Sequence, residues 1–205
     1  YRYSVHMKPV NAVPRLAAEY LQALQSNDLG KAYDMFSSMA KANCSLEEFK
    51  AARNPTPWVW SDIKAVRIEP EAAVVGYKLS VEGRPPAKDF LHFIREEGGW
   101  ARPYNWTLLQ KAEAALERSD VDMALLLSQA AVAVNPRDPM ARGYLCEAVF
   151  YRRVPQETER ECAKAIELSR TYPSKLSMKS LSHLHSILGD TYKDSLRRYP
   201  EAVEQ

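Results

Sequence analysis

Apolar residues recur at helical spacing in the first part of the chain. Residues 14–26 place leucine, alanine and tyrosine side chains on one face, and residues 29–40 follow the same pattern, which predicts two amphipathic helices. Ser45 followed by Glu48 is a capping-box pattern and predicts a third, short helix over residues 45–53. The prolines that follow end the helical pattern, because proline disfavours a helical residue before it.

The pattern then changes to that of β-strands. Four segments rich in valine, isoleucine and aromatic residues follow one another, at residues 58–68, 72–82, 88–96 and 99–103. Short turns containing proline or glycine separate them at hairpin spacing, so we predict an antiparallel sheet. The second and third segments are largely apolar on both faces, and such strands need cover on both sides of the sheet.

The second half of the chain repeats itself at an offset of 34 residues. Residues 105–138 align with residues 139–172, and a partial third unit occupies residues 182–205. Small residues fall on small residues and larger apolar residues on larger ones, as for Ala112 and Cys146, Ser128 and Cys162, Ala131 and Ala165, and Val132 and Ile166. A period of 34 residues with two helices per unit predicts stacked helix pairs, and small residues mark the places where two helices approach closely.

Each half resembles a known family. The order of elements from Leu16 to Trp100 resembles the nuclear-transport-factor-2-like superfamily, whose helices pack into the concave side of a bent antiparallel sheet. The repeats resemble tetratricopeptide repeats in the run from Ser119 to Ala124 and in Asn135-Pro136, which closes the first unit. The resemblances imply an α+β N-terminal cone domain, with three helices on a bent antiparallel sheet, followed by an all-α tetratricopeptide-type array of helical hairpins.

These patterns divide the chain into an N-terminal extension over residues 1–13, a cone domain over residues 14–104 and repeats over residues 105–205. The chain opens on Tyr1 without an initiator methionine and stops early in its third repeat. We therefore expect a piece of a longer protein in which further repeats follow. A membrane anchor upstream of Tyr1 is an open alternative.

Composition and charge narrow the function classes. The 205 residues are 46% hydrophobic and 26% charged, which is ordinary for a globular chain. Lysine and arginine number 28 against 26 acidic residues, for a net charge of +2, and like charges cluster only as pairs. We therefore expect neither nucleic-acid binding nor a polybasic membrane surface. No stretch approaches the roughly 20 apolar residues that span a bilayer.

Residues that could carry chemistry are sparse. The cysteines Cys44, Cys146 and Cys162 are too few and wrongly spaced for a disulfide framework or a metal site, so we expect buried small hydrophobes. The 4 histidines are scattered, and neither a phosphate-binding loop nor a nucleophile elbow is present. We predict no catalytic residue, no metal and no cofactor.

The cone implied by the first resemblance would enclose a pocket, the one place that suits a small molecule. Its candidate lining residues are Tyr33, Trp60, Tyr77 and His92. General acid–base chemistry would require a desolvated His92 beside a donor such as Tyr77. The simpler interpretation is that His92 is a satisfied strand residue and Tyr77 belongs to the core.

The second resemblance implies a groove lined by the first helix of each pair. That face would carry apolar anchors and a few polar groups: Trp106, Leu109, Glu113, Met140, Glu147, Phe150, His183 and Asp190. Such a mixture suits an extended peptide or a helix of a partner protein. The alternative is that Leu109 and Leu116 are buried between helices or under the cone domain.

We therefore predict a non-catalytic protein–protein interaction scaffold, whose repeat groove binds a partner peptide or helix within a larger assembly. Two alternatives stay open. One is a small-molecule-binding or isomerase-like enzyme that uses the cone pocket, and the other is a homo-oligomeric structural protein. Because cone folds are frequent in exported bacterial proteins, we expect a bacterial protein of the cell envelope or periplasm, with the cytoplasm as the alternative.

Overall fold

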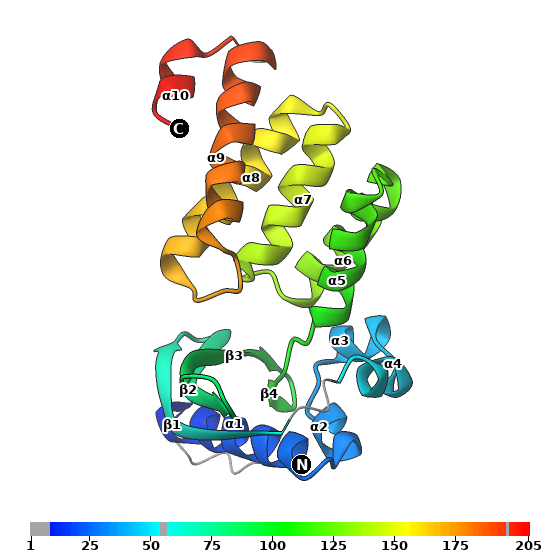
Figure 1. Ribbon diagram of the computed structural model, residues 1–205, viewed down its shortest axis with the longest axis vertical. Helices are drawn as coiled ribbons and strands as arrows, with labels where there is room; N and C mark the ends of the chain where they lie inside the picture. Colours follow the sequence, from blue (N-terminus) through cyan, green and yellow to red (C-terminus); the bar gives the residue numbers. More distant parts are fainter. Residues whose placement is uncertain (1–8, 54–56, 196) are drawn as a thin grey trace. The chain divides into compact units, whose positions relative to one another are not determined.

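The chain divides between Tyr104 and Asn105 into two units (Figure 1). A computed structural model describes residues 9–53, 57–195 and 197–205. Unit 1 holds helices α1–α4 and the sheet, and unit 2 holds helices α5–α10. No helix within the described ranges combines the length and the apolarity that crossing a bilayer requires.

Unit 1 is a four-stranded antiparallel sheet preceded by helices. Its elements in chain order are α1 (Pro9–Gln25), α2 (Leu29–Asp34), α3 (Ser38–Asn43), α4 (Leu46–Ala51), β1 (Trp58–Ile68), β2 (Ala72–Val81), β3 (Ala87–Glu96) and β4 (Gly99–Ala101). The strands pair in the order β1-β2-β3-β4, as successive hairpins. Residues 72–75 of β2 are all buried, so this strand is covered on both faces, as its apolar pattern predicts.

Helix α1 lies along β1 and β2 and buries one face. The buried side chains are Val13, Leu16, Ala17, Tyr20, Leu21, Ala23 and Leu24. The helix begins at Pro9, five residues before the predicted start, and contains Pro14. The predicted helix is present, but the assignment of Pro14 to its first turn is wrong.

The predicted single helix over residues 29–40 is wrong, because a break before Ser37 separates α2 from α3. The Ser37 N–H donates to the Arg102 carbonyl at 2.9 Å, and the Arg102 N–H donates to the Met35 carbonyl at 2.8 Å. The Ser37 hydroxyl accepts from the Ala40 N–H and caps α3. Backbone pairing with a residue distant in sequence thus ends α2, and a local apolar pattern carries no sign of it.

Aromatic rings hold the short helices together. The rings of Phe36 and Tyr104 stack at 4.6 Å, and Phe49 meets both rings edge-on, at 4.9 and 5.2 Å. Tyr33 packs on the same cluster at 5.2 Å from Phe36. Phe49 is 1% exposed, so these rings form a buried aromatic cluster among the short helices.

Unit 2 is entirely helical within the described residues. It contains α5 (Trp106–Glu117), α6 (Val121–Val134), α7 (Pro139–Tyr151), α8 (Pro155–Thr171), α9 (Met178–Asp190), the π-helical turn η1 (Thr191–Ser195) and α10 (Tyr199–Val203). Consecutive helices from α5 to α9 pack on one another (Figure 1). Helix α7 also contacts both α5 and α9, so these three helices form one layer.

The turns of unit 2 repeat the 34-residue offset in their backbone. Ser119, between α5 and α6, and Arg153, between α7 and α8, both adopt a left-handed conformation, with φ of 59° and 58°. In each turn the N–H of the following residue donates to a carbonyl five residues earlier, Asp120 to Ala115 and Val154 to Val149. This is the Schellman arrangement that closes helix C-termini.

The predicted fold class is wrong. We expected three helices packed on a bent sheet as a cone, followed by a regular array of helical hairpins. The chain is helix-rich: it opens on α1, continues through three short helices to a four-stranded antiparallel sheet, and ends in further helices. The short helices α2 and α4 pack on each other through aromatic rings. After α9, a π-helical turn and the short α10 replace a third regular pair.

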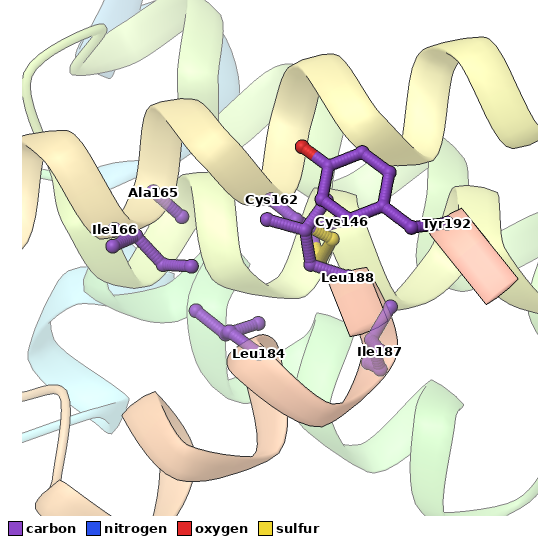
Figure 2. Packing of buried hydrophobic residues seen from close by; sticks show 8 residues of the cluster. All are labelled: Cys146, Cys162, Ala165, Ile166, Leu184, Ile187, Leu188 and Tyr192. Carbon is purple, nitrogen blue, oxygen red and sulfur yellow. A yellow bond between two sulfur atoms is a disulfide. The ribbon is translucent and has the colours of Figure 1, made fainter. Parts of the chain in front are cut away.

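One hydrophobic core of unit 2 lies between α7, α8, α9 and η1 (Figure 2). Its buried members are Cys146, Cys162, Ala165, Ile166, Leu184, Ile187, Leu188 and Tyr192. Gly143 also belongs to this contact, since a Cβ there would lie only 3.4 Å from a methyl carbon of Leu184. Small residues on α7 and α8 therefore let the helices approach, and the leucine and isoleucine side chains of α9 close the core.

Cys146 and Cys162 form a disulfide between α7 and α8. The prediction that all three cysteines are small hydrophobes is therefore wrong for this pair, although Cys44 is a buried free thiol. Both bonded cysteines are fully buried, and Figure 2 shows their sulfurs joined within the apolar cluster. The two positions lie in the alignment columns where the repeat places small residues, so the helices are close enough there for a bond.

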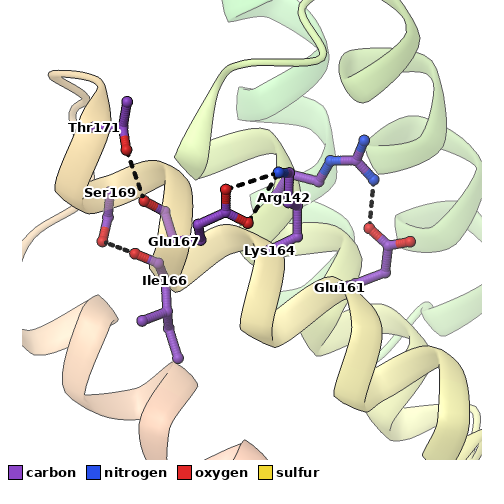
Figure 3. Close-up of polar contacts among 7 residues, drawn as sticks. All are labelled: Arg142, Glu161, Lys164, Ile166, Glu167, Ser169 and Thr171. Atoms are coloured by element: carbon purple, nitrogen blue, oxygen red, sulfur yellow. Dashed lines mark hydrogen bonds and ion pairs between the residues drawn. The ribbon is translucent and has the colours of Figure 1, made fainter.

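A buried ion pair links the same two helices. Glu161 of α8 has a side chain that is 6% exposed, and its carboxylate accepts from the guanidinium of Arg142 on α7 (Figure 3). Arg160 also donates to Glu161, from a largely exposed position. Figure 3 also shows Lys164 and Glu167, which form an exposed pair one turn further along α8. The buried carboxylate is therefore compensated by two guanidinium groups.

Candidate functional site

The predicted cone-pocket residues do not form one site. Tyr77 lines a cavity between α1 and the sheet. Tyr33 lies in the aromatic cluster, and its hydroxyl donates to the Cys44 carbonyl at 2.9 Å. Trp60, on β1, and His92, 8% exposed on β3, do not line the cavity. An acid–base pair of His92 and Tyr77 is therefore not assembled there.

The layer of α5, α7 and α9 brings together polar side chains that can form hydrogen bonds. Glu113 of α5 lies beside the Tyr144 hydroxyl of α7, and Glu147 of α7 lies beside the hydroxyls of Tyr144 and Tyr151. The Glu147 carboxylate is also 3.6 Å from Nε2 of His183 on α9. We call these five residues the α5/α7/α9 face. It consists of carboxylates, phenols and one imidazole drawn from three helices.

Electrostatics on this face keep the phenols protonated. Burial and the neighbouring carboxylates of Glu113 and Glu147 raise the pKa of Tyr144 well above its usual value. Burial and Glu147 raise the pKa of Tyr151 in the same direction. Both phenols therefore remain neutral donors that share the face with two carboxylates. A cation would gain from the carboxylates and from the aromatic rings.

The other predicted groove residues lie apart from this cluster. Trp106 is 38% exposed at the start of α5, and Met140 is half-buried at the start of α7. Leu109 is 3% exposed, so its side chain is buried between helices. Phe150 is partly buried and packs against the core of Figure 2. Asp190 lines a shallow depression with residues of α9 and α10.

Sequence reasoning missed Tyr144 and Tyr151. They precede and follow Glu147 by three and four residues, so a helix places all three on one side. That spacing was a usable signal within α7. The approach of Glu113 and His183 to the same place depends on how α5 and α9 pack on α7, which one helix cannot reveal.

The described residues offer no centre for metal chemistry. No group of three or more histidine, cysteine, aspartate or glutamate side chains there lies close enough to hold an ion. On the α5/α7/α9 face, hydrogen-bond donors, acceptors and rings converge from three helices.

Comparisons with known proteins leave the chain without a family. No family model matches it, and no curated protein sequence matches it. The first resemblance, to the nuclear-transport-factor-2-like superfamily, therefore has no support from a family model or a related sequence. Among solved structures, the N-terminal domain of stress-induced protein-1 (STI-1) from C. elegans is similar over 49% of this chain and 76% of that chain, with a TM-score of 0.42 and 18% identity. A likeness of this degree supports no statement about function.

Proposed function

We propose that this chain is a non-catalytic scaffold that binds a protein partner through the α5/α7/α9 face. The observation that carries the proposal is the convergence, from three helices of one layer, of Glu113, Tyr144, Glu147, Tyr151 and His183. A surface assembled from three helices can contact an extended segment or a helix of another chain along its length.

The chemistry of the face favours a partner segment that carries lysine or arginine. Glu113 is exposed, and the Glu147 side chain is 21% exposed, so both carboxylates can accept charge-assisted hydrogen bonds. Tyr151 is 49% exposed beside them, and its ring can contact a cation. A guanidinium or ammonium group could then contact carboxylate and ring together.

Peptides selected on the purified chain from a random library test this proposal. We expect the selected peptides to be rich in basic residues, and Glu113→Gln/Glu147→Gln to weaken their binding by about tenfold or more, or about 1.4 kcal/mol. The matched variant Glu157→Gln/Glu204→Gln removes two exposed carboxylates elsewhere and should leave affinity unchanged. Equal loss in both variants, or peptides without basic residues, would contradict the proposal.

The disulfide favours a location of the protein in an oxidising compartment. Structural disulfides persist where the environment is oxidising, as in the bacterial periplasm or outside cells, and are rare in the cytosol. The bond between Cys146 and Cys162 therefore supports an exported, envelope-associated scaffold. Trapping of thiols in intact cells should find these two cysteines oxidised, and finding them reduced would argue for the cytoplasm.

A further inference from the structure

Unit 1 contains a cavity whose lining differs in character from the α5/α7/α9 face. It has a volume of about 410 Å³ and lies between α1 and strands β2 and β3, which is within the usual size of small-molecule sites. Its apolar wall is made by Leu21, Leu24, Trp58, Leu79, Val81 and Leu91.

The charges around the cavity are mostly positive. Arg53, Arg84 and Arg102 line it, against the single carboxylate of Asp89. Within the described part of the chain, none of these three arginines forms an ion pair with a carboxylate. Three guanidinium groups beside an apolar wall favour a negatively charged ligand.

Asp89 offsets only one of the three positive charges. Its carboxylate accepts from the Tyr77 hydroxyl at 2.9 Å and from the Phe90 N–H at 2.9 Å. Burial and Asp89 raise the pKa of Tyr77 far above its usual value, so the phenol keeps its proton and remains the donor. Three guanidinium groups against one carboxylate leave the lining with an excess of positive charge.

Arg102 is the arginine held most firmly. Its backbone pairs with Met35 and Ser37, and its guanidinium donates to the His92 carbonyl and lies 4.9 Å from the ring centroid of Tyr20. Its Nε is buried and has no hydrogen-bond partner among the described residues. No carboxylate among the described residues pairs with this guanidinium, so an anion bound in the cavity would supply one.

We propose that this cavity binds a small amphipathic anion, with a carboxylate head group at the arginines and an apolar body along the leucine and valine side chains. The inference does not depend on the partner-binding proposal, since every residue in it belongs to unit 1. Trp58 lines the cavity, and the Arg53 guanidinium lies 6.0 Å from its ring centroid. A bound anion should therefore change tryptophan fluorescence.

Titration of the full chain with decanoate, followed by calorimetry and tryptophan fluorescence, tests the proposal. We expect saturable binding at one site, at least tenfold weaker binding of decanol, and no saturable binding of decylammonium or butyrate. Decanol keeps the ten-carbon apolar chain without the negative charge, and butyrate keeps the carboxylate without a long apolar chain. Equal affinity for decanoate and decanol, or no saturable binding of decanoate at millimolar concentration, would overturn it.

Arginine variants locate the head group. Arg102→Gln should weaken decanoate binding by about tenfold and Arg84→Gln, at an exposed position, by a smaller factor, whereas Arg170→Gln on α8 should have no effect. If Arg102→Gln does not fold, Arg53→Gln/Arg84→Gln takes its place, with the same tenfold loss expected. Unchanged affinity in the variants that fold would overturn the assignment of the head group to these arginines.

Discussion

Reduction of the disulfide between Cys146 and Cys162 is expected to lower the free energy of unfolding of unit 2 by about 3 kcal/mol, the value for a closed loop of about 15 residues. The two cysteines are 16 residues apart and join α7 to α8 inside the core. In the chain-entropy account, breaking the bond raises the conformational entropy of the unfolded chain, and this lowers the free energy of unfolding. Urea unfolding with and without a reductant measures the difference.

Two variants control this experiment. Cys146→Ala/Cys162→Ala should unfold like the reduced chain and should not respond to a reductant. Cys44→Ala removes the free buried thiol and should keep the full response. If the denatured, unreduced chain titrated three thiols instead of one, or if reduction left the unfolding midpoint unchanged, the disulfide would have no part in the stability of unit 2.

Replacement of Arg142 by methionine should cost about 3 kcal/mol, the low end of the range for breaking a buried ion pair. The change keeps the length of the apolar stem but leaves Glu161, 6% exposed, with only the exposed Arg160 as its partner. Removing one member of a buried pair is costlier than removing both, because the remaining charge stays desolvated. Urea unfolding of Arg142→Met measures this cost.

A double variant separates the effect of the unpaired charge from the effect of lost packing. Arg142→Met/Glu161→Leu should recover stability to within about 1 kcal/mol of the parent chain. Lys164→Met breaks the exposed pair with Glu167 seen in Figure 3 and should cost less than about 0.5 kcal/mol. A double variant as unstable as Arg142→Met alone would show that the lost stability comes from packing.

The strands and most helices were readable from local patterns, because each pattern is decided by neighbours in sequence. Alternation and turn residues located β1 and β2 within one residue of their observed ends. The break at Ser37 was not readable, since it depends on hydrogen bonds to Arg102. The fold class was wrong for a related reason: which helices cover a sheet is a property of packing, and here aromatic rings direct α2 and α4 toward each other.

The candidate sites show the same limit. The small-residue columns containing Cys146 and Cys162 already placed two thiols where helices meet, so the disulfide could have been inferred from the repeat. Only the α7 part of the cluster around Glu147 could be predicted, from the spacing of Tyr144 and Tyr151 on one helix. The cavity arginines come from three separate segments, and only the tertiary fold brings them together.

Site-specific photo-cross-linking in native cells tests the partner-binding role most directly. A benzophenone side chain in place of Tyr151, 49% exposed on the α5/α7/α9 face, should form a covalent adduct with a different polypeptide, and Glu113→Gln/Glu147→Gln should suppress the adduct. The same probe at Leu126, 61% exposed on α6, should form none. Adducts of equal yield at both positions, none at Tyr151, or an adduct with a second copy of the chain would contradict the proposed scaffold, the last in favour of a homo-oligomer.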